Sequence, residues 1–246
     1  YFYQDARARM YADTLLAKNN YLRSPTWLKV LLDGFASGIN YYLYKNPNVK
    51  PKIIHRFEPW MPLLFTEGSI GGNITIIPIQ GIKDFYEGND MGYQVPEIPE
   101  WEQEPAGSNG FAIAPELTKN GYPLLLINPH TSFYFRTEVH LVSEEGLNTY
   151  GAITWGQFFV YQGFNEKCGW MHTSGAADVA DEYLETIEKR GSDYYYLYEN
   201  KWLPVKTRKE IIYFQTNKSK LSREITLYFT HHGPIIARKD GKWVSI

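Results

Sequence analysis

Hydrophobic residues recur at helical spacing in the first sixty residues of the chain. Between Pro25 and Asn46, apolar side chains return every three or four positions and form a single stripe. Ser24 followed by Pro25 predicts the start of this helix, with Ser24 as the N-cap, and Asn46-Pro47 predicts its end. An earlier helix is expected over residues 5–18. The apolar stripe between Pro25 and Asn46 consists of Leu28, Leu31, Leu32, Phe35, Ile39, Tyr42 and Leu43.

An acidic, proline-rich segment follows at residues 94–105. Its sequence, QVPEIPEWEQEP, has prolines at positions 96, 99 and 105. Because proline lacks a backbone N–H, this segment cannot continue as a helix or as a central strand. We therefore expect an exposed linker here.

Short apolar segments bounded by turn residues dominate the chain after this linker and predict strands. Asn120-Gly121 predicts a hairpin turn between the first two strands, and Asp240-Gly241 predicts a second one near the end. The order of helices, linker and hairpins indicates an α+β protein. The expected strands cover residues 111–114, 122–127, 136–142, 150–155, 158–161, 194–198, 210–216 and 223–229.

Composition narrows the class of protein. The 246 residues include 25 basic and 27 acidic side chains, a net charge of −2, so the basic surface of a nucleic-acid-binding protein is not expected. No apolar run approaches the roughly 20 residues that span a bilayer. The 20 Tyr, 13 Phe and 7 Trp suit a β-rich protein, a binder of flat or apolar ligands, or both. Because the chain starts at Tyr1 and ends at Ile246 in what resembles mid-strand, we expect a piece of a longer protein.

Two further candidates are weak. Cys168 is the single cysteine, which excludes an intramolecular disulfide and a cysteine-based zinc cluster, and we expect it to be a small buried residue. His231-His232 resembles a metal-binding pair. Adjacent residues of a strand point to opposite faces, however, so a structural role is expected for both.

The junction between linker and strands carries the most informative chemistry. If the chain is cut between Gly107 and Ser108, Ser108 gains a free α-amine beside its hydroxyl. An α-amine has a pKa of about 7.7–8.0, so much of it is unprotonated at neutral pH and can act as the base for the hydroxyl. Gly107 suits a distorted backbone with nothing bulky beside the attacking oxygen. The alternative is that Gly107-Ser108-Asn109-Gly110 is simply a turn.

Several motifs, in order, resemble the penicillin acylase family of N-terminal nucleophile hydrolases, which includes acyl-homoserine-lactone and cephalosporin acylases. Residues 33–40 and 57–60 look like the end of that family's α chain. The later motifs are Gly107-Ser108-Asn109, Phe111-Ala112-Ile113, residues 121–130, Gly163-Phe164-Asn165, Gly169-Trp170, residues 178–183 and His231-His232-Gly233-Pro234.

This resemblance implies the fold and the main site residues. The family has a four-layer αββα sandwich, which this chain would hold incompletely. Ser108 would be the nucleophile, freed by autocatalytic cleavage after Gly107, and His130 would tune the protonation of its amine and hydroxyl. The backbone N–H of Ser174 would be one oxyanion donor. The chain would then divide into an α-chain segment (1–93), a spacer (94–107) and a β-chain segment (108–246). For His130, a surface histidine after a strand is the alternative.

The resemblance also implies a metal site and a cellular location. Asp178 and Asp181 match two carboxylates of a structural calcium site, and oxygen ligands suit this cation. Carboxylates on a solvated loop are the alternative. The implied protein has no organic cofactor, binds neither nucleic acid nor membrane, assembles from the α and β chains of one precursor, and is periplasmic or secreted.

Two functions therefore remain open. The first is an amidohydrolase that splits a small-molecule acyl amide through an acyl-enzyme at Ser108. The second is an aromatic-rich β module that binds glycans or peptides without catalysis. Self-cleavage at Ser108 distinguishes the two.

Overall fold

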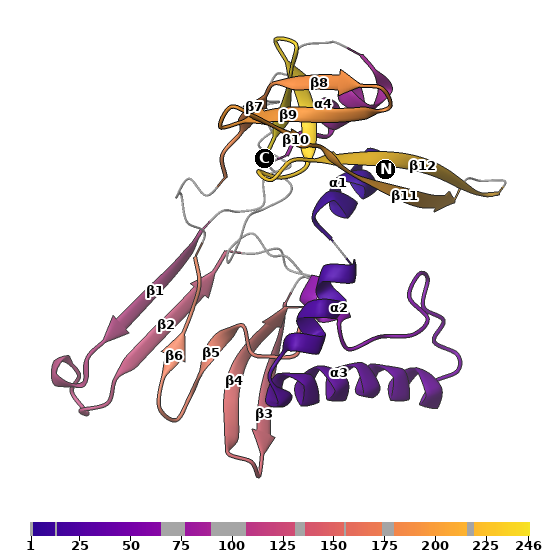
Figure 1. The fold of residues 1–246 in the computed structure, drawn as a ribbon. Coiled ribbons are helices and arrows are strands. Elements are labelled where there is room, and N and C mark those ends of the chain that lie inside the picture. The colour runs from indigo at the N-terminus through magenta and orange to yellow at the C-terminus, as the bar shows by residue number, and fades with distance from the viewer. Residues whose placement is uncertain are drawn as a thin grey trace. The chain divides into compact units, whose positions relative to one another are not determined.

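The computed structural model describes residues 2–12, 14–64, 77–89, 107–130, 136–154, 156–173, 180–215 and 219–246. The chain forms two compact units (Figure 1), each of which combines helices with antiparallel strands. This confirms the mixed α and β composition, whereas the four-layer sandwich stays a prediction. The first unit consists of Tyr1–Asp13, Gly72–Glu97 and Ala177–Ile246, and the second of Thr14–Gly71 and Ile98–Ala176. The division into residues 1–93, 94–107 and 108–246 concerns processing of the chain and also stays a prediction.

The helical part of the second unit contains α2 (Thr14–Arg23) and α3 (Thr26–Lys45). The structure confirms α3, but the helix expected over residues 5–18 is wrong. Two helices cover that region, α1 (Phe2–Tyr11) in the first unit and α2 in the second.

The predicted N-cap of α3 is also wrong. Pro25 occupies the N-cap position, and the Ser24 hydroxyl donates to the carbonyl oxygen of Asn20, 2.8 Å away. This bond joins Ser24 to the end of α2. Farther along α3, the Asn40 amide forms two hydrogen bonds with the backbone of Phe57, which hold the segment after the helix against it.

The described part of the second unit also contains a 3-10 helix at Met61–Leu64 and two antiparallel sheets. The first pairs β1 (Ser108–Ile113) with β2 (Leu124–Pro129), so Ser108 begins a strand whose neighbour is the expected one. Gly121 has a left-handed φ of +70°, but the connection is longer than a tight hairpin turn and includes a short 3-10 helix at Pro115–Leu117. The second sheet has the order β3 (Arg136–Ser143), β4 (Leu147–Thr154), β5 (Gln162–Asn165), β6 (Gly169–Trp170).

Glycines set the close packing of these sheets. Gly151 of β4 lies directly opposite Gly163 of β5. A Cβ on Gly151 would stand 2.1 Å from the carbonyl oxygen of Gln162, so neither strand has room for a side chain there. The strand expected over residues 158–161 is wrong. These residues form bends instead, and the backbone N–H of Tyr161 donates to the carbonyl oxygen of Ala152 in β4.

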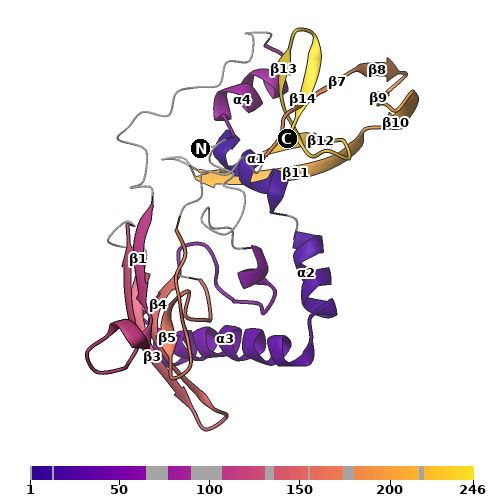
Figure 2. The same cartoon turned by 90° about the vertical axis from the view of Figure 1, so that its left-hand side faces the viewer.

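The first unit is built mainly of antiparallel strands. Two further helices pack on them: α1 contacts β11, and α4 (Ile79–Glu87) contacts β13 (Figures 1 and 2). The expected turn at Asp240-Gly241 is confirmed between β13 and β14, with φ of 50° and 73°. The strands are β7 (Tyr183–Glu185), β8 (Ile187–Arg190), β9 (Asp193–Tyr198), β10 (Lys201–Pro204), β11 (Lys206–Gln215), β12 (Lys220–Phe229), β13 (Ile235–Lys239) and β14 (Lys242–Ser245).

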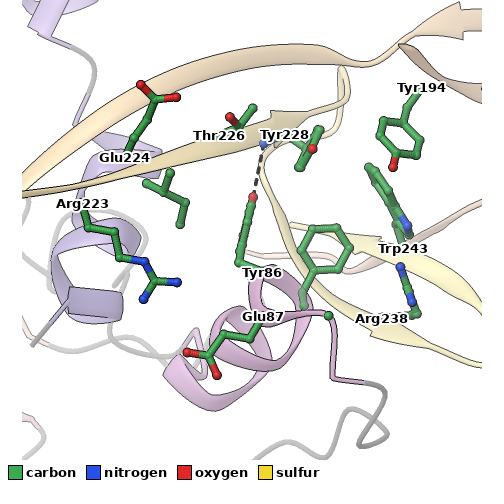
Figure 3. A pocket seen from close by; sticks show the side chains of 12 residues that line it. Tyr86, Glu87, Tyr194, Arg223, Glu224, Thr226, Tyr228, Arg238 and Trp243 are labelled. Atoms are coloured by element: carbon green, nitrogen blue, oxygen red, sulfur yellow. Dashed lines mark hydrogen bonds between the residues drawn. The ribbon is translucent and has the colours of Figure 1, made fainter. Parts of the chain in front are cut away.

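A partly buried tyrosine joins α4 to two strands of this unit. The Tyr86 hydroxyl donates to the carbonyl oxygen of Ile235 at 3.1 Å and accepts from the backbone N–H of Tyr228 at 3.2 Å. Figure 3 shows the second of these bonds, with Tyr86 extending from α4 toward β12. Burial raises the pKa of Tyr86 well above its ordinary value.

Within the described ranges, none of the helices combines the length and the apolar character that crossing a membrane requires.

Candidate functional site

Ser108 lies where the backbone conformation depends on a glycine. The preceding residue, Gly107, has a φ of +112°, a region that L-amino acids with a side chain rarely adopt. Space alone does not exclude a side chain at this position, because the nearest atom to a Cβ on Gly107 would be His130 Nδ1, 3.9 Å away. The requirement for glycine therefore comes from the backbone.

The carbonyl group of Gly107 receives two hydrogen bonds. The Ser108 hydroxyl donates to its oxygen at 2.6 Å, and the backbone N–H of His130 donates to the same oxygen at 3.3 Å. The second bond extends the pairing of β1 and β2 by one step beyond Ser108 and Pro129. The peptide bond before Ser108 is thus polarised by neighbours that the hairpin itself supplies.

The His130 side chain contacts two asparagines on one face of the hairpin. Asn109 and Asn128 are direct cross-strand partners, and His130 lies two residues beyond Asn128, so the three share a face. His130 Nε2 is 3.1 Å from Asn109 Nδ2 and 3.2 Å from Asn128 Oδ1, and Asn109 Nδ2 donates to Asn128 Oδ1 at 3.3 Å. All three side chains are exposed in this chain.

Sequence reasoning named His130 but missed Asn109 and Asn128. The available signal was the alternation of strand residues, which puts positions 128 and 130 on one face. The pairing register was also needed to bring Asn109 to that face, and only the structure supplies it.

The segment after β6 also reaches β1. The Thr173 hydroxyl lies 3.4 Å from the carbonyl oxygen of Ser108, to which it donates. Met171 packs over Gly110, since a Cβ on that glycine would stand 2.0 Å from Met171 Sδ. Ser174, the expected oxyanion donor, lies outside the described residues, although its neighbour Thr173 contacts Ser108.

The expected calcium ligands are described only in part. Asp181 is an exposed residue just before β7 in the first unit, whereas Asp178 lies outside the described residues. The carboxylate of Asp181 is a hard oxygen donor of the kind that calcium prefers. Across the described ranges, no group of three or more His, Cys, Asp or Glu side chains is arranged to hold a metal ion.

The structure corrects the interpretation of His231-His232. These residues lie in a bend after β12, not in a strand, and their rings are side by side with centroids 3.7 Å apart. His231 Nδ1 is 3.0 Å from the Tyr196 hydroxyl, and the His232 ring stacks on Tyr183 at 3.8 Å. The pair thus has structural contacts, as expected, but for a different geometric reason.

A buried carboxylate anchors this bend. Glu185 of β7 is 3% exposed, and its Oε1 accepts hydrogen bonds from the hydroxyls of Thr230 and Ser245 at 2.7 and 2.8 Å. His232 Nδ1 lies 2.8 Å from the same oxygen. The three contacts tie the start of the bend and the last strand to β7.

The expectation that Cys168 is buried is wrong. It lies exposed in the turn between β5 and β6, where its backbone N–H and that of Lys167 donate to Asn165 Oδ1. The turn is closed by the asparagine, and it leaves the thiol at the surface.

A pocket of about 450 Å³ lies in the first unit between α4 and strands β12–β14. Figure 3 shows Tyr194, Tyr228 and Trp243 on one side and Arg223 and Glu87 on the other. Arg223 lies over the ring of Phe2 at 4.5 Å. Aromatic and charged side chains dominate the described lining of this pocket.

Comparisons with known proteins identify a matching family and similar sequences. The penicillin amidase family model matches residues 1–246. The acyl-homoserine lactone acylase QuiP of Pseudomonas fluorescens is 31% identical over 130 residues, which is 53% of this chain and 15% of that protein. QuiP of Pseudomonas aeruginosa is 30% identical over 143 residues, or 57% of this chain and 16% of the relative.

A relative with a different name gives the same result. The acyl-homoserine lactone acylase PvdQ of Pseudomonas fluorescens is 31% identical over 137 residues, which is 53% of this chain and 17% of that protein. The chain thus spans about a sixth of the length of these relatives.

Proposed function

Because this chain belongs to the penicillin amidase family, we propose that it is part of an acyl-amide hydrolase whose nucleophile is Ser108. The nucleophile forms when the precursor cleaves itself between Gly107 and Ser108. Residues before the cut then belong to the α chain and spacer, and residues from Ser108 onward begin the β chain.

The observation that carries this proposal is the pair of hydrogen bonds on the Gly107 carbonyl oxygen. The Ser108 hydroxyl is 2.6 Å from this oxygen, and so it is close to the carbonyl carbon that it must attack. When attack places negative charge on the oxygen, the His130 N–H is already directed at it. One preorganised donor of this kind contributes roughly 3 kcal/mol to the stabilisation of such an intermediate.

The cleavage step requires no reagent other than water. Ser108 Oγ bonds to the Gly107 carbonyl carbon, its proton passes to His130 Nδ1, and that proton moves to the Ser108 nitrogen as the C–N bond breaks. Water then hydrolyses the ester between Gly107 and Ser108 Oγ. The products are a carboxylate on Gly107 and a free amine and hydroxyl on Ser108.

After the cut, the same hydroxyl acts on substrate. The free α-amine of Ser108 removes the hydroxyl proton as Oγ attacks the carbonyl carbon of an acyl amide, and it then protonates the departing amine. The resulting acyl-enzyme is hydrolysed by water. We propose the Ser174 N–H as one oxyanion donor for this reaction.

The family supports a proposal for the class of substrate. The three relatives compared above are named acyl-homoserine lactone acylases, and an acyl-homoserine lactone carries its acyl group on an amide nitrogen. We propose an N-acyl amide of a small molecule as the substrate of this protein as well.

A structural calcium ion and export to the periplasm or beyond are part of the same proposal. Asp178 and Asp181 would hold the ion, which would stabilise the segment leading into β7 and take no part in bond cleavage. Calcium is tested by the thermal midpoint of the purified protein with and without a chelator. The midpoint is expected to fall for wild type and to stay unchanged for Asp181→Ala.

The proposed nucleophile is tested by comparing three forms of the full-length protein. Wild type is expected to give two chains, the second with Ser108 at its N-terminus by sequencing and intact mass. Ser108→Ala is expected to stay a single chain, whereas Ser108→Cys, which keeps a nucleophile, still splits. If wild type stays whole and binds glycans or peptides, the protein is a binding module and the proposal is wrong.

A further inference from the structure

Three side chains meet at one nitrogen of His130. Asn109 Nδ2, Asn128 Oδ1 and His130 Nε2 form a triangle with sides of 3.1, 3.2 and 3.3 Å. The other ring nitrogen, Nδ1, lies on the side of Gly107, 3.9 Å from the position that a Cβ on Gly107 would take. In the neutral ring, a contact that places the proton on Nε2 therefore leaves a lone pair on Nδ1, and a contact that keeps Nε2 bare places the proton on Nδ1.

The triangle cannot satisfy all three contacts at once. If Nε2 carries the proton, it donates to Asn128 Oδ1, and its contact with Asn109 Nδ2 brings two donors together. If Nε2 is bare, it accepts from Asn109 Nδ2, and its contact with Asn128 Oδ1 brings two acceptors together. The two asparagines thus favour opposite tautomers of the same ring.

We propose that Asn109 and Asn128 are positioning residues that set the tautomer of His130 in opposite directions. Asn128 favours the proton on Nε2, which leaves a lone pair on Nδ1, the ring nitrogen on the Gly107 side. Asn109 favours the proton on Nδ1, which blocks that lone pair. This inference rests on the proposed cleavage at Ser108.

The cleavage chemistry explains why Asn128 is the productive partner. For Nδ1 to accept the Ser108 proton, Nε2 must already carry its own proton. The ring keeps that Nε2 proton while it is an imidazolium and again after Nδ1 returns its proton to the leaving nitrogen. Asn128 Oδ1 therefore accepts a hydrogen bond from Nε2 throughout the step, whereas the contact with Asn109 is productive only in the form that cannot act as a base.

The register of the hairpin makes this arrangement specific. Asn109 follows the nucleophile directly and pairs across the sheet with Asn128, while His130 follows Asn128 by two positions. His140 provides a comparison in the same unit, because its Nε2 contacts Asn148 Oδ1 at 2.8 Å on the β3–β4 hairpin. The His140–Asn148 pair, unlike the His130–Asn128 pair, is not next to a serine that follows a glycine with a left-handed φ.

The test combines imidazole ¹⁵N NMR with cleavage rates in the full-length protein. Spectra are recorded on ¹⁵N-histidine protein in a Ser108→Ala background, which keeps the precursor intact, and His130→Gln identifies the His130 signals by their loss. Asn128→Ala is expected to lower the Nε2–H fraction, and Asn109→Ala to raise it. In the background with Ser108, Asn128→Ala slows cleavage about fivefold, the effect of one neutral hydrogen bond on a rate, and Asn109→Ala speeds it.

Controls separate positioning from a structural effect. Asn128→Asp keeps an acceptor and is expected to restore both the Nε2–H fraction and the cleavage rate, while Asn148→Ala changes neither. If both asparagine variants shift the tautomer in the same direction, or if the tautomer moves without a change in cleavage, the inference is wrong. If the Ser108→Ala protein still yields a chain that begins at residue 108, the proposed function fails, and the NMR result still decides the tautomer assignment.

Discussion

The backbone N–H of His130 donates to the carbonyl oxygen of Gly107, with 3.3 Å between the two atoms. This bond joins the residue after β2 to the residue before β1, and so it fixes the end of the hairpin at the proposed cleavage bond. The same residue contributes its backbone to the carbonyl and its ring to the neighbouring asparagines. The site is therefore built from a local hairpin, and among the described residues Thr173 and Met171 reach it from farther along the chain.

The left-handed backbone at Gly107 predicts a specific sensitivity. In Gly107→Ala, the new Cβ has space, but a φ of +112° costs a non-glycine residue about 1–3 kcal/mol. The chain is expected to relax toward ordinary φ and to move the carbonyl away from the Ser108 hydroxyl. Cleavage should then slow by about tenfold or more, as measured by the loss of precursor with time on a gel.

Gly121→Ala is the matched control for this substitution. Gly121 also has a left-handed φ, +70°, and open space around it, and it lies in the connection between the same two strands. It should destabilise the protein by a similar amount without slowing cleavage. Equal cleavage by both variants would mean that the Gly107 conformation does not contribute to the reaction.

Two tyrosines of the first unit, Tyr86 and Tyr11, predict opposite outcomes when the hydroxyl is removed. Tyr86→Phe leaves the Ile235 carbonyl and the Tyr228 N–H without their partner, which should cost about 1–3 kcal/mol. The Tyr11 hydroxyl is buried with no hydrogen-bond partner among the described residues, so Tyr11→Phe should be neutral or stabilising. Urea unfolding of both variants measures the difference, and an equal loss would contradict the assigned role of Tyr86.

The same tyrosines predict how stability changes with alkaline pH. Burial raises the pKa of both hydroxyls above the ordinary value, so the folded protein keeps protons that the unfolded chain releases above pH about 10. Their contribution is fully present below that pH and is lost as pH rises toward the folded pKa. The free energy of unfolding should therefore fall with pH in this range, and less steeply in Tyr86→Phe than in wild type.

The buried carboxylate of Glu185 predicts a large effect on stability. Removing it leaves the hydroxyls of Thr230 and Ser245 and the His232 ring without an acceptor, so Glu185→Ala should cost about 3–5 kcal/mol. Glu188→Ala is the control, because that exposed residue forms a surface ion pair with Arg190 and its removal should cost at most about 1 kcal/mol. Thermal unfolding of the two variants provides the comparison.

Local sequence signals predicted the parts of the fold that local physics determines. The apolar stripe and its terminating Asn46-Pro47 predicted α3, and Asp240-Gly241 predicted the last hairpin, because helix periodicity and turn chemistry act over a few residues. The placement of Ser108 at the start of a strand also followed from the sequence around it. Each of these depends on neighbours within about ten positions.

The features that sequence reasoning missed depend on contacts between distant segments. Ser24 bonds back to α2 instead of capping α3, and the His231-His232 rings are brought together by Tyr183 and Tyr196 of other strands. Asn109 joined the candidate site only through the pairing register with Asn128. No local pattern reports which strand residue will lie opposite another.

The central claim is that Ser108, once freed, carries the acyl group during turnover. The most direct test is intact and peptide mass spectrometry of the full-length protein after brief exposure to an activated acyl ester. We predict that the mass of one acyl group is added to the peptide that begins at Ser108 and that hydroxylamine removes it. An acyl group on another residue, or turnover without any acylated chain that begins at Ser108, would contradict the account.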